Sequence, residues 1–231
     1  MKKIGLVGGI SWTSTLDYYR YINEGINKKR GGLHFAECII YSLNFGDIQA
    51  NSWENSFELL LKACESLKRS TVDGIALCAN TAHLFADELE KETQLPFIHI
   101  AVATAAAVNL QGLRKVGLLG TKFTMEMSFY RAKLEAAGLE VIIPAKRKTR
   151  DYIQHTIKEE LGIGLINPAT KRKYISIVNE LVALGAQCII LGCTEIPMLI
   201  SQEDFSIPVF DTTKIHSQAI VEFATCTKTF K

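Results

Sequence analysis

Residues 3–8 read KIGLVG, and residues 115–120 read KVGLLG. Each stretch is a short apolar run that ends in glycine, which is typical of a buried strand followed by a tight turn. A second pair of similar stretches follows, since residues 72–78 read VDGIALC and residues 187–193 read QCIILGC. The interval from the glycine to the later cysteine is nearly the same in both halves of the chain. This pattern indicates an internal repeat and predicts two similar lobes.

Similar apolar runs recur along the chain and alternate with longer amphipathic stretches. Strands are predicted at residues 3–7, 37–42, 74–77, 97–99, 115–119, 140–143, 188–191 and 209–210. Helices are predicted at residues 53–68, 81–92, 125–137 and 171–184. Nearly all-apolar strands that alternate with helices form parallel sheets covered on both faces. The predicted fold class is therefore α/β, with two pseudo-symmetric lobes that each contain a mostly parallel sheet flanked by helices.

The two lobes divide the chain unequally. The first lobe is predicted to comprise residues 1–99 plus 208–231, and the second lobe residues 100–207. Open α/β sheets bind their ligands at the carboxyl ends of the strands. We therefore expect an active site in the cleft between the lobes, to which each lobe contributes the end of a strand.

The composition excludes several classes of protein. With 231 residues and 48% apolar residues, the chain is long enough for a full core and too apolar for wholesale disorder. Its 26 Lys and Arg nearly balance its 24 Asp and Glu, so charge gives no case for a nucleic-acid or membrane-surface partner. The apolar runs are too short for a signal peptide or a membrane span. We predict a cytoplasmic protein whose six cysteines stay reduced.

Two cysteines occupy matching positions in the repeat. Cys78 and Cys193 each end an apolar strand, and a helical segment follows each of them. The positive end of a helix stabilises a thiolate or binds a substrate carboxylate. The alternative is that each cysteine is a buried small hydrophobe, which we retain for the other four: Cys38, Cys64, Cys188 and Cys226. No Cys-x-x-Cys or Cys-x-x-His pair is present, so no metal site is expected.

Six stretches carry a family resemblance. They are IGLVGGISWTST at 4–15, YYRYINEGI at 18–26, CANTAH at 78–83, GLLGTKFTM at 117–125, LGCTEIP at 191–197 and PVFDTTKIHSQA at 208–219. With them the sequence resembles the aspartate/glutamate racemase superfamily, and within it the aspartate racemases and broad-specificity amino-acid racemases. Glu195 is typical of that branch, because glutamate racemases usually carry His there. They also carry Asp-Ser where this chain has Ile10-Ser11.

The resemblance implies an enzyme that interconverts L- and D-amino acids without pyridoxal phosphate or any other cofactor. Cys78 and Cys193 would remove and return the α-proton on opposite faces of the substrate. The resemblance also implies a homodimer and a small-molecule amino-acid substrate. The implied substrate-binding residues are Ile10, Ser11, Gln49, Asn80, Thr81, Thr121 and Thr194, with Glu195 and His83 in supporting roles.

Several alternatives stay open from the sequence. Thr81 and Thr194 fit helix N-caps, and His83 and His216 fit interior histidines. Aspartate is the first candidate substrate, but no Arg occurs within residues 44–49, which leaves a broad-specificity or glutamate racemase open. A maleate isomerase-like or decarboxylase relative would use one cysteine. A non-catalytic amino-acid-binding protein would need the cleft without the thiols. The absence of spaced glycines after Gly8 argues against a dinucleotide cofactor.

Overall fold

The computed structural model describes residues 1–226, which form two compact units. Unit 1 comprises Met1–Ile100 and the chain from Thr213 onward, and unit 2 comprises Ala101–Thr212. The elements follow the order β1 (Ile4–Gly8), α1 (Trp12–Arg30), β2 (Cys38–Ser42), α2 (Phe45–Asn51), η1 (Trp53–Asn55), α3 (Phe57–Arg69), β3 (Gly74–Leu77), η2 (Thr81–Phe85), α4 (Ala86–Thr93), α5 (Ile100–Leu110), β4 (Lys115–Gly120), α6 (Lys122–Glu126), α7 (Ser128–Ala136), β5 (Glu140–Ile142), α8 (Arg147–Glu159), η3 (Leu161–Ile163), α9 (Pro168–Ala183), β6 (Cys188–Gly192), η4 (Ile196–Met198), η5 (Gln202–Asp204), β7 (Val209–Asp211) and α10 (Thr212–Thr225).

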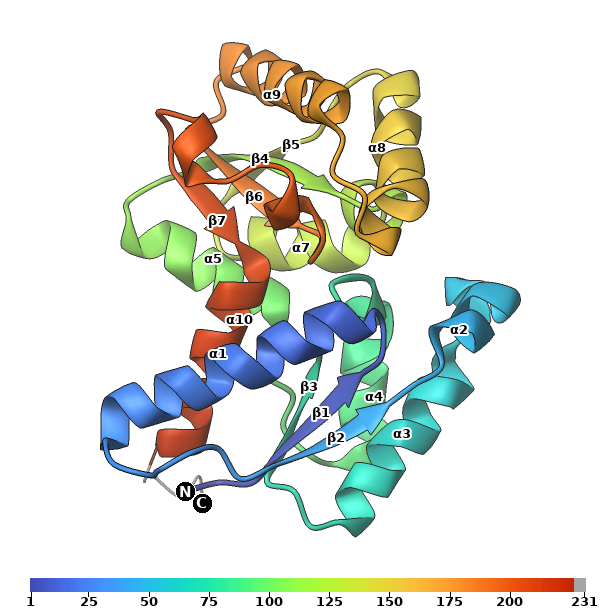
Figure 1. Ribbon diagram of the computed structural model, residues 1–231, viewed down its shortest axis with the longest axis vertical. Coiled ribbons are helices and arrows are strands. Elements are labelled where there is room, and N and C mark those ends of the chain that lie inside the picture. The colour runs from blue at the N-terminus through green and yellow to red at the C-terminus, as the bar shows by residue number, and fades with distance from the viewer. Residues whose placement is uncertain (227–231) are drawn as a thin grey trace. The chain divides into compact units, whose positions relative to one another are not determined.

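Unit 1 is built on a parallel sheet with the strand order β2-β1-β3. Side chains alternate between its two faces, as in any strand. Leu6 and Ala76 pack with Ile220 in a cluster that joins the sheet to α1 and α10. Val7 and Leu77 belong to a second cluster, formed with α3 and α4 on the opposite face. Helices therefore cover both faces of this sheet (Figure 1).

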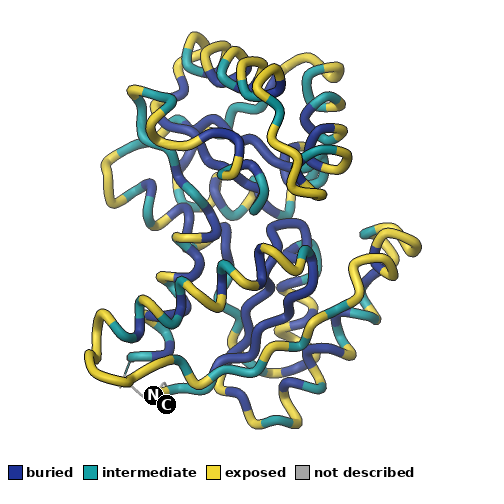
Figure 2. The backbone as a smooth tube through the Cα atoms, in the orientation of Figure 1, coloured by how far each residue is buried: buried dark blue, intermediate teal, exposed yellow. Residues whose placement is uncertain are grey.

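Unit 2 is built on a parallel sheet with the strand order β5-β4-β6-β7. Leu119 and Leu191 pack against α8 and α9 in one apolar cluster. Helices α5 and α7 lie over the other face (Figure 1), and the side chain of Asn109 on α5 donates to Ala137 O at 3.0 Å. In both units the central strands are buried along their length (Figure 2), because each strand lies between two helical layers.

A glycine shapes the turn that leaves β1. Gly9 has a φ of +83°, and a Cβ atom at this position would lie 2.1 Å from Leu43 O. Only glycine fits a left-handed residue this close to the neighbouring chain. The turn leads directly into α1, which places the start of that helix at the carboxyl end of the sheet.

The α/β prediction is confirmed, and so are seven of the predicted strands to within a residue at each end. The strand predicted at 97–99 is wrong, because only an isolated bridge joins Phe97 to Ile75. Pro96 carries no N–H to extend the ladder. Residues 208–212, expected with the first lobe, lie in unit 2 because β7 pairs with β6.

Several predicted helices differ in detail. The segment predicted at 81–92 begins as the 3₁₀ helix η2, and α4 starts only at Ala86. The helix predicted at 125–137 is broken at Met127, whose backbone is extended. The helix predicted at 53–68 divides into η1 and α3. Among residues 1–226, no helix combines the length and the apolar character needed to cross a bilayer.

Candidate active site

Cys78 directly follows β3 at the carboxyl end of the unit 1 sheet. Its backbone N–H donates to Val7 O at 2.9 Å, which continues the pairing of β3 with β1 by one residue. The Cys78 side chain is fully buried and packs in the cluster that contains Tyr18. The Ser14 hydroxyl lies 3.0 Å from Ser11 O and 3.4 Å from Cys78 O, so the first turn of α1 is joined to the cysteine backbone.

The Cys78 thiol lies in an environment that favours its protonated form. Burial raises the pKa of Cys78 well above its ordinary value, and the nearby thiol of Cys38 raises it further. The expectation of a thiolate stabilised by an α-helix is not met here, because the short 3₁₀ helix η2 follows Cys78 and the α-helical segment starts at Ala86. At neutral pH, the Cys78 thiol is therefore protonated.

The residues that follow Cys78 are buried with it. Asn80 is 3% exposed and Thr81 is 5% exposed. Asn80 occupies the cap position of η2, so the alternative that Thr81 caps a helix is wrong. The loop after β1 adds Ile10, which is buried in the apolar cluster with Leu77, and the half-buried Ser11. Ser11 occupies the N-cap of α1 without a capping bond from its side chain.

Cys193 takes the matching position after β6 in unit 2. Its thiol donates to Glu195 Oε2 at 2.9 Å, and the Thr194 hydroxyl donates to the same oxygen at 2.8 Å. Glu195, and not Thr194, occupies the N-cap position of the 3₁₀ helix η4, so the N-cap alternative for Thr194 is also wrong. Pro197 lies in the first turn of that helix. One carboxylate therefore holds both neighbouring side chains.

The environment of Cys193 also favours the protonated thiol. Burial raises its pKa well above the ordinary value, and the negative charge of Glu195 and the hydrogen bond to it raise the pKa further. Backbone hydrogen bonds from Glu195 and Ile196 act in the opposite direction. The Cys193 thiol thus has an acceptor for its proton, Glu195 Oε2, within hydrogen-bond distance.

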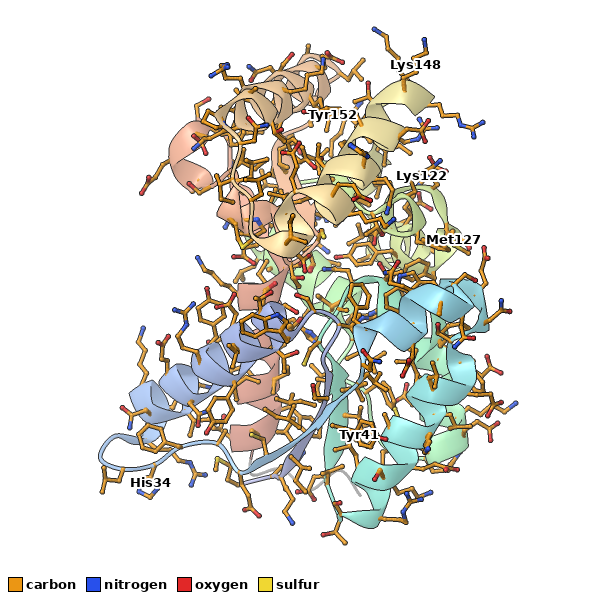
Figure 3. All side chains as sticks on the ribbon, turned by 45° about the vertical axis from the view of Figure 1, so that its right-hand side comes forward. His34, Tyr41, Lys122, Met127, Lys148 and Tyr152 are labelled. Carbon is orange, nitrogen blue, oxygen red and sulfur yellow. The ribbon has the colours of Figure 1, made fainter. Side chains whose placement is uncertain are left out.

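Thr121 follows β4 next to the Cys193 loop, because Gly120 pairs with Gly192 across the two central strands of unit 2. The Thr121 hydroxyl accepts from the backbone N–H of Thr124 at 3.2 Å and caps α6. The next residue, Lys122, donates its backbone N–H to Gln154 Oε1 at 2.9 Å. Figure 3 shows Lys122 beside α8, where its ammonium group lies 2.7 Å from Asp151.

Apart from Gln49, the predicted site residues thus lie on the loops and first turns that follow β1 and β3 in unit 1 and β4 and β6 in unit 2. Gln49 is exposed on α2, and no bond joins its side chain to either group within the described residues. Ser14 and Gln154 were not predicted from the sequence, and they support these loops from neighbouring helices. Ser14 lies four residues before the buried Tyr18, so the helical periodicity of α1 would have placed it on the buried face.

Residues Lys146 to Arg150 include four basic side chains, and most of this stretch forms the first turn of α8. Lys148 points away from the unit (Figure 3). Arg150 bonds Glu126 at 2.7 Å and two backbone carbonyl groups, so it supports the fold. Across residues 1–226, no three His, Cys, Asp or Glu side chains are grouped closely enough to hold a metal ion.

The two groups of residues lie in a region that a known family shares. The profile of the Asp/Glu/Hydantoin racemases matches residues 7–220. This chain belongs to that family. It is 22% identical over 227 residues to the broad specificity amino-acid racemase RacX of Bacillus subtilis (strain 168), covering 94% of this chain and 96% of the relative.

Two crystal structures resemble the chain along its whole length. A Yersinia pestis protein, assigned provisionally to the Asp/Glu racemases, is 44% identical with a TM-score of 0.91. The match covers 98% of this chain and 100% of that one. An aspartate racemase homologue from Pyrococcus horikoshii OT3 is 37% identical, with a TM-score of 0.83 and the same coverage. The predicted family membership is therefore confirmed.

Proposed function

We propose that this chain is an amino-acid racemase that interconverts L- and D-amino acids with Cys78 and Cys193 as its two acid/base groups. The observation that carries the proposal is the repeated placement of a buried cysteine directly after β3 and after β6. In each unit that strand pairs with the strand of the glycine motif. Two thiols suit racemisation, because either group can be the acid or the base depending on the hand of the substrate.

The proposed reaction moves one proton at each face of the α-carbon. The thiolate of one cysteine takes the proton from the Cα–H bond, and the electron pair stays on the substrate as a carbanion conjugated with its carboxylate. The thiol of the other cysteine then gives its proton to the opposite face. Asn80, Thr81, Thr121 and Thr194 are the proposed donors to the substrate, where preorganised hydrogen bonds stabilise the developing charge.

The bond between Cys193 and Glu195 suggests which thiol loses its proton before the reaction begins. A thiol becomes a base only after it loses its proton, and Glu195 Oε2 is within hydrogen-bond distance of the Cys193 thiol. Cys78 packs among apolar side chains, with the Ser14 hydroxyl 3.4 Å from its carbonyl oxygen, and starts as the acid. The cationic ammonium group of the substrate would favour the thiolate further.

Substitution of each cysteine tests the proposal. Cys78→Ser and Cys193→Ser should each lower racemisation at least roughly 10²-fold, the usual contribution of a positioned proton-transfer group. Cys64→Ser and Cys188→Ser are matched controls, because both residues are buried free cysteines in the core. Racemisation is followed by chiral chromatography and by deuterium uptake at the α-carbon, from each enantiomer, without pyridoxal phosphate.

The outcomes separate the alternatives. If one of the two site variants racemises at the rate of the controls, the two-thiol mechanism is wrong and a one-cysteine enzyme is favoured. If the wild-type protein binds amino acids without exchanging the α-proton, it is a binding protein. Activity that requires pyridoxal phosphate would contradict the cofactor-independent mechanism.

Aspartate is the first substrate we propose, with Gln49 as the residue facing its side chain. A broad-specificity racemase is the second candidate, because no Lys or Arg occurs from Leu43 to Asn55 to pair with an acidic side chain. Initial rates over a panel of acidic, neutral and basic amino acids decide between the two. The predicted homodimer is checked on the same preparation by sedimentation analysis.

A further inference from the structure

Three histidines of unit 1, His83, His99 and His216, have their rings close together near the Cys78 loop. The ring centroids of His83 and His99 are 4.7 Å apart, and those of His83 and His216 are 5.5 Å apart. His83 is 3% exposed and His216 is fully buried. The three residues come from η2, from the segment before α5 and from α10. We call them the histidine cluster, and the proposed proton transfers make no use of it.

His83 joins two separate stretches of backbone. Its Nδ1–H donates to Ala79 O at 2.9 Å, and its Nε2 accepts from the backbone N–H of Ile100 at 3.2 Å. A carbonyl oxygen only accepts and an amide N–H only donates, so these partners fix the neutral tautomer with its proton on Nδ1. Burial lowers the pKa of His83 well below its ordinary value, and the neighbouring His99 and His216 lower it further.

His216 holds the same stretch of backbone from α10. Its Nε2–H donates to Ile98 O, at 2.6 Å, and its Nδ1 accepts from the Tyr18 hydroxyl at 2.8 Å. The segment from Ile98 to Ile100 is therefore held by two buried imidazole rings. This segment is also where the chain leaves unit 1, since Ala101 is the first residue of unit 2.

The bonds of His83 connect this crossing segment to the candidate acid. Ala79 is the residue directly after Cys78, so its carbonyl group is part of the backbone that orients the thiol. Cys78 is fixed from its other side by the bond of its own N–H to Val7 O. Any change in the position of Ile100 is transmitted through one rigid ring to the Cys78 loop.

We propose that His83 is a positioning residue, which sets the Cys78 loop against the segment through which the chain passes into unit 2. The proposal rests on the proposed function for its effect on turnover, and the loop itself can be tested without it. A side chain that only fills space in the core would be replaced without loss by an apolar residue of similar size. A positioning residue requires its polar atoms at defined places.

Three variants of His83 separate its two bonds. His83→Leu removes both of them. His83→Asn keeps an N–H donor at the place of Nδ1, toward Ala79 O, and His83→Gln keeps an oxygen acceptor at the place of Nε2, toward Ile100 N–H. His155→Leu is the control, because His155 is an exposed histidine on α8 in unit 2.

The first measurement is the alkylation rate of Cys78 by iodoacetamide, resolved by peptide mass spectrometry. Cys193 in the same chain is the internal reference. The proposal predicts that His83→Leu changes the Cys78 rate at least about fivefold while the Cys193 rate stays constant, and that His83→Asn restores it more than His83→Gln does. All variants are measured at one temperature well below their thermal midpoints, and the Cys78 rate is divided by the Cys193 rate of the same sample to correct for general destabilisation.

The second measurement is racemisation. The proposal predicts that kcat falls by up to roughly 10²-fold in His83→Leu, as for a displacement of about 1 Å, with little change in KM. His83→Asn should recover most of kcat. If Cys78 alkylation in His83→Leu matches the wild type, or if Asn and Gln give equal rates, the positioning role is wrong. If the wild type does not racemise at all, the proposed function fails while the alkylation comparison still decides this proposal.

Discussion

At the scale of single residues, the bond between Glu195 and Cys193 is the contact with the clearest chemical consequence. The carboxylate accepts from the thiol and its charge raises the pKa of Cys193. Glu195→Gln removes that charge with little change in shape, so the pKa of Cys193 should fall. The pH profile of Cys193 alkylation, measured by peptide mass spectrometry, should shift to lower pH. Glu203→Gln, on an exposed residue of η5, is the control, and an unchanged profile would contradict this account.

The sequence predicted that Cys78 and Cys193 take matching positions after β3 and β6, because a repeated position in two halves of a chain carries information that a single residue does not. It was not sufficient to assign Thr81 and Thr194. Threonine before a helical stretch commonly caps the helix, yet Asn80 and Glu195 hold the cap positions here. Which of several adjacent polar residues takes the cap depends on the backbone angles of the turn, which local composition does not determine.

At the scale of elements, the turn after β1 should be sensitive to any added side chain. Gly9→Ala places a Cβ atom 2.1 Å from Leu43 O in a residue whose φ is +83°. We expect a loss of roughly 2 kcal/mol or more in the free energy of unfolding, measured in urea. Gly32→Ala is the matched control, because Gly32 also has a positive φ, +57°, with nothing within 4 Å of the added atom. Equal losses in the two variants would show that the close approach does not matter.

Elements were predicted best where burial alone determines them. The apolar strands β1, β3, β4 and β6 were found because both faces of each sheet are covered by helices. The ends of the helices were predicted less well. The split of residues 125–137 at Met127 and the 3₁₀ start at Thr81 depend on backbone angles that the helical periodicity of the side chains does not report.

At the scale of the whole molecule, the buried histidines make stability depend on pH. The unfolded chain protonates His216 near the ordinary pKa of 6.5, whereas burial lowers the pKa in the folded protein to about 4. The unfolded state therefore binds more protons between these values, so stability rises with pH across this window and is lost as the pH falls. The contribution of His216 to the loss between pH 6.5 and pH 4 is roughly 3 kcal/mol.

The His216→Gln variant tests that dependence. Its amide group can still donate to Ile98 O, but it does not titrate, so the slope of the unfolding free energy against pH should be smaller than in the wild type. The measurement is urea unfolding at several pH values from 4 to 7. His34→Gln, on an exposed histidine, should keep the wild-type slope. If the wild type and His216→Gln show the same slope, His216 does not titrate differently on folding.

The path of the chain between the units affects how the protein is made. Unit 2 is one continuous stretch, Ala101–Thr212, whereas the sheet of unit 1 also needs Ile220, Val221 and Ala224 of α10 to cover the face that α1 shares. Translation delivers the chain from its N-terminus. We therefore expect the face of β1, β2 and β3 that α1 and α10 share to stay partly uncovered until α10 has followed unit 2 out of the ribosome. A released fragment that ends at Thr212 should therefore hold a folded second unit and bind chaperones through its first unit, whereas the full chain should not.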